Sequence, residues 1–554
     1  MTIKTNMQPE RRSAMLESGA WNDKIITDYL DQAVSSAPNS AALIAYRVSE
    51  DERRVISYRE LNGLVTRMAA GLAALGVNKS DVVSCQLPNW WQTTALHLAC
   101  VRIGAILNPL MPIFRERELA FMLGHAQSRV LVIPHSFRGF NYPAMVQGMR
   151  DELPDLEHVL VIGGDHSADC FEQVLLQRAW EEEVDTQALF AERRLAGDDV
   201  VQLLYTSGTT GEPKGVLHSS NTLFSNVRPY AERLQLGSED IVFMASPIAH
   251  QTGFLYGLMM PIYLKSTAVL QDIWDARFAV KVVNAERPTF TMASTPFLAD
   301  LIDIAPEHRE ELSSLGIFVA AGAPIPSALV EKASTAVNAR IISAWGMTES
   351  GAVTMTRLHD DAERAIHTDG LALPFTEVMI ADEHGNEVPR GTEGNLLVRG
   401  ASVFVGYLKR PELYGVDDHG WFATGDLARM DAQGYIRITG RTKDVVIRGG
   451  ENIPVVEIEN LLYKHPAISA VALVGCPDPR LGERLCAYVT LHDADSSLSL
   501  EEVVSFLLQQ RLTRNYLPEY LEVLQALPRT PSGKIQKFKL REQAADIRLD
   551  SAKR

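Results

Sequence analysis

The sequence predicts an α/β fold with two domains, and three observations support this prediction. The chain has 554 residues, which is too long for a single hydrophobic core, so at least two domains are expected. In the first half, amphipathic helical patterns alternate with short apolar runs, as in layered structures built around a largely parallel sheet. From about residue 378 the apolar segments become short and are separated by Gly and Asp turns, which is typical of antiparallel structure.

The elements of the first half follow from the spacing of the apolar residues. Residues 57–75 are expected to form a helix, which begins with a capping box made by Ser57 and Glu60. Its buried face is expected to carry Leu61, Val65, Met68 and Leu72. A second helix is predicted at 93–103, with buried strands at 82–87, 130–133 and 200–204. These segments predict a large N-terminal domain of layered α/β subdomains.

The last third of the chain is expected to add a small β structure and a second domain. Residues 378–438 predict an antiparallel meander or a small, distorted β-barrel. The charged string from Arg441 to Asp444 then marks a boundary between an N-terminal domain over 1–442 and a small α+β domain over 443–554. In the second domain, helices are predicted at 454–464 and 500–510, and strands at 470–475 and 487–491.

Composition argues against several classes of partner. The net charge of -16 disfavours nucleic acid and anionic membrane surfaces, because both require clustered Lys and Arg. The five cysteines show no metal-ligand spacing, which fits a reducing compartment. The first residues lack the apolar core of a signal peptide, and no apolar stretch is long enough to cross a bilayer. We therefore expect a cytoplasmic protein without nucleic-acid partners or an integral membrane segment.

The strongest local signal is the glycine-rich string at residues 205–215, directly after the strand predicted at 200–204. Glycines let the backbone turn so that amide N–H groups converge, hydroxyls add donors, and Lys214 adds a cation. The spacing differs from the Walker A pattern, because Lys214 stands between Pro213 and Gly215. The residues expected to surround a phosphate group are Thr206, Ser207, Gly208, Thr209, Thr210, Gly211 and Lys214.

Four further strings follow in order along the chain. They are Ala320-Ala321-Gly322-Ala323-Pro324, Ala344-Trp345-Gly346-Met347-Thr348-Glu349, Trp421-Phe422-Ala423-Thr424-Gly425-Asp426 and Pro528-Arg529-Thr530-Pro531-Ser532-Gly533-Lys534. Together with the glycine-rich loop, this series resembles the adenylate-forming enzymes, which include acyl-CoA synthetases, luciferase-like enzymes and the adenylation domains of peptide synthetases. The chain looks most similar to bacterial short- and medium-chain acyl-CoA synthetases, including the cyclohexanecarboxylate–CoA ligase type. This resemblance implies ATP, Mg²⁺ and coenzyme A.

The resemblance also implies a role for each motif residue. The implied adenine contacts are Gly322, Ala323, Pro324, Trp345, Gly346 and Met347. Thr348 would contact the α-phosphate, and Mg²⁺ would be bound by Glu349 and Thr206. The implied ribose contacts are Asp426 and Arg441, with Ile438 beside them in the nucleotide site.

In relatives, the C-terminal domain changes orientation between two half-reactions, which are the formation of the acyl-adenylate and the transfer of the acyl group to coenzyme A. The resemblance makes Lys534 the lysine that enters the site for adenylation, where an ammonium group can neutralise developing charge. It also makes Lys534 a candidate for a protein lysine acetyltransferase, because acetylation would remove that charge. Lys443 matches the hinge, and Gly449 and Gly450 match the opening for the pantetheine arm of coenzyme A.

The acyl pocket is expected around the segment 246–254, and its implied residues are His250, Gln251, Thr252 and Phe254. His250 either gates access to the pocket or orients the carboxylate, or it is a hydrogen-bonded structural histidine. No Lys or Arg stands out as a partner for a second carboxylate, so an apolar monocarboxylic acid is expected, either a medium-chain fatty acid or an alicyclic acid.

Two alternatives remain at this point. An adenylation enzyme that loads the phosphopantetheine of a carrier protein would share every ATP motif. A non-catalytic nucleotide-binding protein is disfavoured by the joint presence of Thr348, Glu349, Asp426, Arg441 and Lys534. A homodimer is compatible with the sequence.

Overall fold

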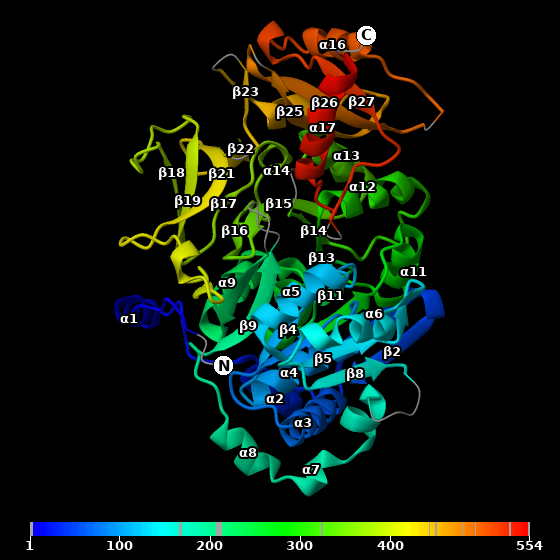
Figure 1. Ribbon diagram of the computed structural model, residues 1–554, viewed down its shortest axis with the longest axis vertical. Coiled ribbons are helices and arrows are strands. Elements are labelled where there is room, and N and C mark those ends of the chain that lie inside the picture. The colour runs from blue at the N-terminus through cyan, green and yellow to red at the C-terminus, as the bar shows by residue number, and fades with distance from the viewer. Residues whose placement is uncertain are drawn as a thin grey trace.

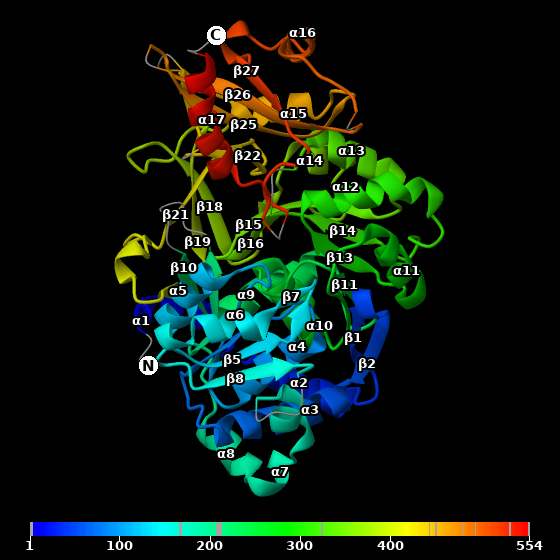
Figure 2. The same ribbon diagram turned by 45° about the vertical axis from the view of Figure 1, so that its right-hand side comes forward.

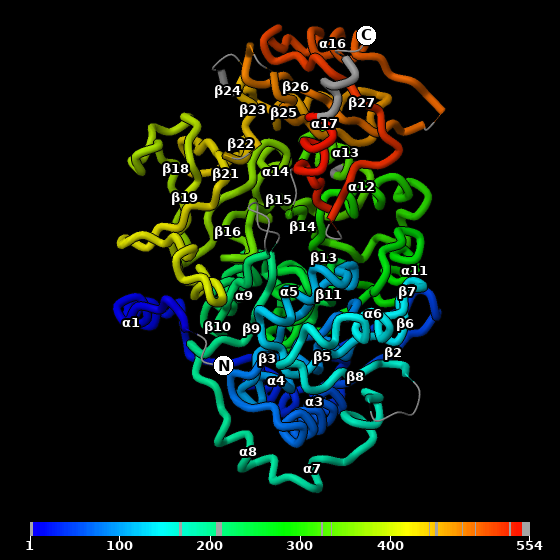
Figure 3. Tube along the Cα trace, viewed as in Figure 1, coloured from blue at the N-terminus to red at the C-terminus, as the bar shows by residue number. Residues whose placement is uncertain are grey.

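The computed structural model describes residues 4–164, 169–206, 213–322, 325–442, 444–448, 451–478, 480–493, 495–530 and 533–551. Two large sheets stack in the lower and middle parts of the molecule, and a smaller domain lies above them (Figure 1). A view turned by 45° shows the same layers, with the C-terminal residues at the top in both views (Figure 2). Figure 3 traces the chain through these parts without the ribbons.

The first large sheet has the strand order β17-β16-β15-β14-β13-β11-β12-β1-β2 and is parallel from β15 to β1. Its strands are β1 (Ala41–Arg47), β2 (Glu52–Ser57), β11 (Ile241–Met244), β12 (Thr267–Gln271), β13 (Phe290–Ala293), β14 (Ile317–Ala320), β15 (Arg340–Met347), β16 (Gly351–Met355) and β17 (Leu371–Ala372). The carboxyl ends of β13, β14 and β15 lie side by side, and the motifs at 320–324 and 344–349 begin there.

The second large sheet has the order β20-β10-β9-β4-β3-β5-β8. Its strands are β3 (Val82–Cys85), β4 (Ile106–Pro109), β5 (Ser128–Pro134), β8 (His158–Ile162), β9 (Val200–Thr206), β10 (Lys214–Ser219) and β20 (Gly406–Tyr407). Strands β9 and β10 are antiparallel neighbours next to the edge strand β20, and the glycine-rich string lies between them in the sequence. A separate two-stranded ribbon pairs β6 (Ser136–Phe137) with β7 (Phe140–Asn141).

The two sheets enclose the main core between them. The helices that contribute to this inner layer are α2 (Ile26–Ser36), α3 (Tyr58–Ala74), α4 (Trp91–Arg102), α9 (Ser220–Arg233), the π-helical η4 (Gly253–Met259) and α10 (Met260–Leu264). The outer face of the first sheet is covered by α11 (Ala276–Glu286), α12 (Thr295–Ile304), α13 (Ser327–Ala336) and α14 (Ala362–His367). The outer face of the second sheet is covered by α5 (Glu116–Ala126) and α6 (Tyr142–Gly148).

Shorter elements complete the N-terminal part. They are α1 (Pro9–Glu17), η1 (Val48–Glu50), η2 (Arg150–Glu152), η3 (Glu172–Gln177), α7 (Trp180–Glu183), α8 (Thr186–Glu192), η5 (Ala305–Glu307) and η6 (Pro411–Leu413). The predicted layered α/β architecture is confirmed.

Helix α3 illustrates how local sequence sets an element. The Ser57 hydroxyl accepts from the Glu60 N–H and the Glu60 carboxylate accepts from the Ser57 N–H, so the predicted capping box is present. The four residues predicted for the buried face are fully buried: Leu61, Val65, Met68 and Leu72. The helix follows the 3.6-residue period, which places these positions on one side.

The predicted barrel is wrong in one respect, because no closed barrel is found among the described residues. Instead, β18 (Thr376–Ala381), β19 (Gly394–Gly400), β21 (Phe422–Met430) and β22 (Ile436–Arg441) form an antiparallel sheet whose first and last strands do not pair with each other. The turn pattern predicted the antiparallel meander correctly. Closure depends on pairing between distant edges, which local turn signals do not encode.

The C-terminal part has its own sheet and its own two cores. Its strands are β23 (Val446–Arg448), β24 (Glu451–Ile453), β25 (Ile468–Asp478), β26 (Gly482–Leu491) and β27 (Tyr520–Val523). Its helices are α15 (Val455–Leu462), η7 (Arg514–Tyr516), α16 (Leu500–Gln509) and α17 (Lys537–Ser551). One face of the sheet packs on α15 and α16 and the other on α17, which agrees with the predicted α+β arrangement. Among the described helices, none combines the length and apolar character needed to cross a membrane.

Candidate active site

The glycine-rich loop begins where β9 ends at Thr206 and closes where β10 begins at Lys214, and these two residues are register partners. Ser207, Gly208, Thr209, Thr210 and Gly211 lie outside the described residues. The Lys214 ammonium lies 3.4 Å from the Tyr407 hydroxyl and 4.6 Å from the centre of its ring. A cation is therefore held at the base of the predicted phosphate loop.

Glu349 lies in the turn after β15 and is only 6% exposed. The Tyr407 hydroxyl donates a hydrogen bond of 2.7 Å to Glu349 Oε1. Burial, together with the neighbouring carboxylate, raises the pKa of Tyr407, so its hydroxyl stays a donor. Tyr407 connects Lys214 to Glu349, and no local pattern in the sequence marked it, because the contact joins residues 58 positions apart.

Thr348 is positioned by His218, which, like Tyr407, no pattern in the sequence predicted. The His218 Nε2–H donates to the Thr348 carbonyl at 2.8 Å, and Nδ1 lies 3.0 Å from the Thr222 hydroxyl. Because a carbonyl can only accept, Nε2 carries the proton. Burial lowers the pKa of His218 to about 4, so the imidazole is neutral at physiological pH. The predicted phosphate contact thus lies on a fixed backbone.

The predicted ribose and adenine residues meet at Asp426, which is 4% exposed. Trp345 Nε1 donates to Asp426 Oδ2 at 3.0 Å, and Arg441 Nε donates to Oδ1 at 2.8 Å. Asp426 and Arg441 are register partners on β21 and β22, which explains their approach. Ile438 lies on the same strand, and its N–H donates to Asp369 Oδ2 at 2.8 Å. The structure therefore brings together an aromatic ring, a buried carboxylate and a guanidinium.

Two of the remaining adenine residues, Ala323 and Pro324, lie outside the described residues. Gly322 follows β14 with a φ of +81°, a conformation that glycine adopts readily. Gly346 and Met347 end β15 beside Trp345, where a Cβ on Gly346 would come within 2.2 Å of the Gly351 carbonyl. The absence of a side chain at Gly346 therefore lets β15 lie close to Gly351 next to Trp345, the predicted adenine contact.

Lys534 comes from the C-terminal domain, on the chain that descends toward the ends of β13 and β14 before α17 (Figures 1 and 2). Gly533 has a φ of +82°, and a Cβ there would come within 2.8 Å of Ser294 Oγ and 2.9 Å of Pro296 Cγ. Only glycine allows this approach of the loop to the start of α12. The Lys534 N–H donates to Thr530 Oγ1 at 3.0 Å, which closes the turn.

The pKa of Lys534 is shifted by burial and by charged groups of other predicted site residues. Burial and, to a smaller extent, Arg441 lower the pKa of Lys534, whereas Asp426, Asp444 and Glu349 oppose the change, and the net result is a pKa of about 8. Burial also lowers the pKa of His250 to about 4, and Lys534 contributes to that shift. His250 is therefore neutral beside a cation, and its Nδ1 accepts from the Thr252 N–H at 3.3 Å.

The predicted acyl residues line the start of η4. Gln251 is 4% exposed, and its Oε1 accepts from Gln202 Nε2 at 3.0 Å. Phe254 is fully buried with its ring 4.8 Å from that of His97 in an edge-to-face arrangement. The Asn89 side chain accepts from the Ile248 N–H and donates to the Ser246 carbonyl, so it positions the segment before His250.

Lys443, Gly449 and Gly450, the predicted hinge and coenzyme A residues, lie outside the described residues. Next to the hinge position, Asp444 Oδ1 accepts from Arg541 Nη1 at 2.6 Å. Burial raises the pKa of Asp444, but Arg541, Lys537 and Arg441 together lower it by more. This ion pair joins the domain boundary to α17.

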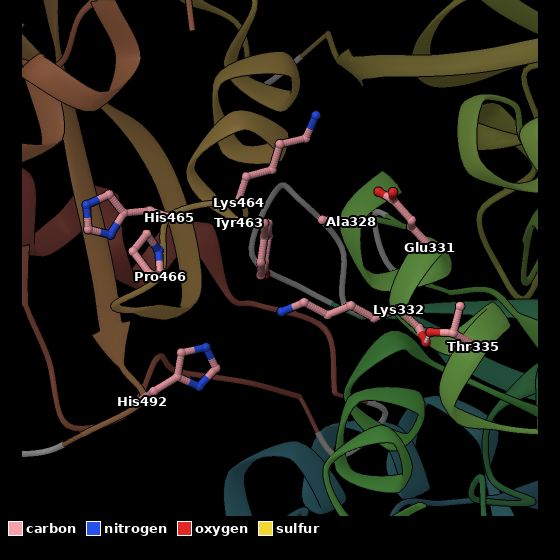
Figure 4. Close-up of a pocket in the computed structure, with 9 residues that line it drawn as sticks. All are labelled: Ala328, Glu331, Lys332, Thr335, Tyr463, Lys464, His465, Pro466 and His492. Atoms are coloured by element: carbon pink, nitrogen blue, oxygen red, sulfur yellow. Dashed lines mark hydrogen bonds between the residues drawn. The ribbon is translucent and has the colours of Figure 1, made fainter. Parts of the chain in front are cut away.

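A separate cavity of about 440 Å³ lies between α13 and the C-terminal domain (Figure 4). In Figure 4 the Lys332 side chain reaches across the gap toward Tyr463 and His492. Its lining residues are Ala328, Glu331, Lys332, Thr335, Tyr463, Lys464, His465, Pro466 and His492. Among the residues that the structure describes, none of those predicted for the nucleotide or acyl site lines it.

The possible metal ligands among the described residues fit Mg²⁺ better than a metal ion that is bound only by protein side chains. Among the described residues, no three His, Cys, Asp or Glu side chains gather in a way that would hold an ion. A single buried carboxylate, that of Glu349, faces the predicted phosphate loop through Tyr407. Magnesium is commonly bound by one or two carboxylates together with substrate phosphates and water, which matches this arrangement.

Comparison with known proteins agrees with this geometry. The family model described as AMP-binding enzyme matches residues 30–408. The chain belongs to the AMP-binding enzyme family. The model of the AMP-binding enzyme C-terminal domain matches residues 457–534, which include Lys534.

Relatives of this AMP-binding enzyme cover almost its full length. It is 35% identical to a medium-chain fatty-acid–CoA ligase of Escherichia coli, over 98% of this chain and 94% of that protein. It is 30% identical to a mitochondrial medium-chain acyl-CoA ligase of Homo sapiens, over 94% of this chain and 88% of that one. As a member of this group, the chain is an AMP-forming acyl-CoA synthetase that uses ATP, Mg²⁺ and coenzyme A.

Solved structures show the same fold. The AMP-binding enzyme superposes on ATP-bound MatB from Rhodopseudomonas palustris with a TM-score of 0.81, at 26% identity over 94% of this chain and 99% of that one. The apo form of MatB superposes with a TM-score of 0.71 at the same identity and coverage. A fatty acyl CoA synthetase of Mycobacterium tuberculosis superposes with a TM-score of 0.71 at 27% identity, over 94% of this chain and 98% of that one.

Proposed function

We propose that this acyl-CoA synthetase activates an apolar monocarboxylic acid, either a medium-chain fatty acid or an alicyclic acid such as cyclohexanecarboxylate. The observation that carries the site assignment is the position of Lys534. A loop of the C-terminal domain brings this ammonium within electrostatic range of Asp426, Glu349 and His250. This arrangement supports the proposal that residues far apart in the chain form one site with opposite charges and an apolar side.

In the first half-reaction, an oxygen of the substrate carboxylate attacks the α-phosphorus of ATP, and the bond to pyrophosphate breaks. Lys214 and the loop that begins after Thr206 are proposed to hold the phosphates, and Lys534 to neutralise the charge that develops between the carboxylate and the α-phosphate. Mg²⁺, bound by Glu349 and Thr206, would neutralise phosphate charge. Asp426 would accept hydrogen bonds from the ribose, with Arg441 beside it.

We infer that the domains are in the orientation for adenylation. The close approach of Gly533 to Ser294 and Pro296, at the start of α12, supports this orientation. The higher TM-score against the ATP-bound form of MatB than against its apo form supports the same orientation. For the second half-reaction we propose rotation about Lys443, which would bring Gly449 and Gly450 to the site and divide the chain at 442 and 443.

In the second half-reaction, the thiol of coenzyme A attacks the acyl carbonyl and AMP leaves. Each described cysteine is buried, so none offers a protein thiol for this step. Lysine acetylation at Lys534 is a proposed way to stop the first half-reaction only, because it removes the ammonium that the second does not require.

The apolar character of the acid rests on the surroundings of η4. Phe254 is fully buried, Gln251 is paired with Gln202, and His250 is neutral. No described cation of this segment is available for a second carboxylate. The names of the relatives from Escherichia coli and Homo sapiens favour a medium-chain acid.

A panel of acids tests the proposal. The enzyme is incubated with ATP, Mg²⁺, coenzyme A and one acid at a time, and AMP and the thioester are measured together. We expect the highest kcat/KM with octanoate, decanoate or cyclohexanecarboxylate and the lowest with malonate. Highest activity with malonate would contradict the apolar pocket.

The same assay separates the alternatives. A carrier protein bearing phosphopantetheine replaces coenzyme A in one arm, and no thiol is added in another. Thioester formed only on the carrier would favour the carrier-loading enzyme. Absence of acid-dependent pyrophosphate release with every acid would favour a non-catalytic nucleotide-binding protein.

A further inference from the structure

The N-terminal segment, residues 4–23, precedes the stretch that the AMP-binding enzyme model matches, which begins at residue 30. It contains α1, which lies beside the chain between β19 and β20 (Figure 3). That chain, residues 400–405, joins the antiparallel sheet to the edge strand of the second large sheet. The segment therefore connects to the part of the molecule that carries Tyr407.

The N-terminal segment supplies donors to most carbonyl groups of residues 400–405. Arg11 donates to the carbonyls of Gly400 at 3.2 Å, Val403 at 2.5 Å and Phe404 at 3.4 Å. Trp21 Nε1 donates to the Ala401 carbonyl at 3.0 Å, and the Asn6 N–H donates to the Val405 carbonyl at 2.7 Å. Backbone carbonyls in an irregular segment need such partners when they are buried.

Arg11 is the centre of this arrangement. Besides the three carbonyls, its guanidinium donates to the Tyr414 hydroxyl at 3.1 Å and lies 5.6 Å from the Trp21 ring centre. Burial lowers the pKa of Arg11, which Tyr414 partly opposes, so the charge is held away from water. A guanidinium has five N–H donors in a fixed plane, whereas a lysine has three on one atom. Lysine can therefore replace only part of these contacts.

The segment that Arg11 holds also contacts Glu349. The Phe404 N–H donates to the Glu349 carbonyl at 2.8 Å, and Tyr407 donates to its carboxylate. On the other side, the Val405 N–H donates to Leu217 and the Leu408 N–H to Gly215, both on the strand that follows the phosphate loop. Residues 400–408 thus link the Arg11 side chain to both the backbone and the carboxylate of Glu349.

We propose that Arg11 is a positioning residue for the Mg²⁺–ATP site, acting through residues 400–405 on Phe404, Tyr407 and Glu349. This proposal rests on the proposed role of Glu349 as the metal ligand. Without the guanidinium, the carbonyls of Gly400 and Val403 lose this donor, whereas the Phe404 carbonyl keeps the Tyr414 hydroxyl at 3.2 Å. The segment then gains freedom, so the Glu349 carboxylate is no longer held in one place.

The test compares Arg11→Gln and Arg11→Lys with Arg12→Gln as a matched control. Arg12 is the next residue on α1 and also anchors the N-terminal segment, but its 40% exposed side chain pairs with Asp23 and Asp198 and does not reach residues 400–405. Exposed ion pairs contribute little, so Arg12→Gln should keep the wild-type KM for ATP.

For Arg11→Gln we expect the KM for ATP in pyrophosphate exchange, at fixed Mg²⁺, to rise about tenfold, because hydrogen bonds of a charged donor are lost. The Mg²⁺ concentration for half-maximal activity should rise in parallel. Thioester formation from a supplied acyl-adenylate, which needs neither ATP nor its metal, should keep its wild-type rate. The KM for ATP of Arg11→Lys should lie between that of the wild type and that of Arg11→Gln.

Equal loss in both half-reactions, or an unchanged KM for ATP with Arg11→Gln, would overturn the proposal. If Arg11→Gln does not fold, Arg11→Lys and Tyr407→Phe, alone and combined, keep the test available. If the effects of Arg11→Lys and Tyr407→Phe on the KM for ATP are not additive in the double variant, the two residues act through one chain of contacts. Additive effects contradict the proposal. Glu349→Gln separates the two levels: an unaltered Mg²⁺ requirement there refutes the proposed metal role, whereas an altered requirement with normal Arg11 variants refutes only the positioning role.

Discussion

On the proposed nucleotide side of the site, carboxylates are held by hydrogen bonds and an ion pair, whereas on the proposed acyl side Phe254 is held by packing. Asp426 is fixed by Trp345 and Arg441, and Glu349 is fixed by Tyr407. Phe254, in contrast, is surrounded by apolar residues and His97. Because of this difference, we expect the loss of a nucleotide contact to change the rate of adenylation. A change on the acyl side should instead change which acid is used.

The largest effect is expected from Lys534→Ala, which removes the cation that joins the two sides. Adenylation should fall about 1,000-fold, because a preorganised charge is lost where the transition state develops charge. Thioester formation from a supplied acyl-adenylate should remain close to the wild type. Pyrophosphate exchange and thioester yield measure the two steps separately.

The control is Lys539→Ala, an exposed lysine on the same segment. It should leave both half-reactions unchanged. If Lys534→Ala slows both half-reactions equally, Lys534 is not specific to the first.

Asp426→Asn tests the nucleotide side by itself. The amide keeps the shape of the side chain but weakens the bonds from Trp345 and Arg441 and the proposed bonds from ribose. We expect kcat/KM for ATP to fall between about 10- and 100-fold, with the ranking of acids unchanged. Steady-state kinetics with several acids measures both quantities, and the exposed Asp418→Asn is the control. A changed ranking of acids would contradict the division between the two sides.

Phe254→Ala tests the acyl side. The cavity it leaves should favour bulkier acids over smaller ones by about tenfold in relative kcat/KM, while the KM for ATP stays constant. Phe171→Ala removes an equally buried ring from the same core, outside the predicted acyl segment, and controls for lost stability. An unchanged ranking of acids with Phe254→Ala would remove this residue from the acyl pocket.

The smallest effect is the dependence of adenylation on pH. The pKa of Lys534 is lowered to about 8, so its ammonium form is lost as the pH rises through 8. The kcat/KM for adenylation should therefore fall above pH 8, approaching tenfold per pH unit. Lys534→Arg stays charged, so its profile should be flat between about pH 7 and 9.5, whatever its absolute rate. A wild-type profile that is also flat across this range would contradict the assignment.

His250 sharpens the same measurement at lower pH. Its pKa is lowered to about 4 by burial and by Lys534, so it is already neutral well below pH 6. No inflection near pH 6.5 is expected from this group, and one that disappears in His250→Gln would mean that His250 titrates normally.

Much of the fold followed from local patterns. The helix at α3, its capping box and its buried face depend on residues close together in the chain, and these predictions are confirmed. Local turns predicted the antiparallel strands after residue 378 but left open whether they close into a barrel, because the pairing of the two outer strands is a long-range event. Tyr407, His218 and Arg11 were missed for a related reason. Each of them contacts its site through residues more than 50 positions away, and nothing near it in the sequence records that contact.

The sequence by itself determined the family, the ATP chemistry and the residues that belong to each motif, because glycine-rich turns and charged residues recur at set positions along the chain. Only the tertiary structure decided how these residues meet. The loop that carries Lys534 lies against the start of α12 because Gly533 allows the approach, and Glu349 is held because residues 400–408 pass beside it. Such contacts join distant segments, and their geometry depends on the packing of whole domains rather than on any local pattern.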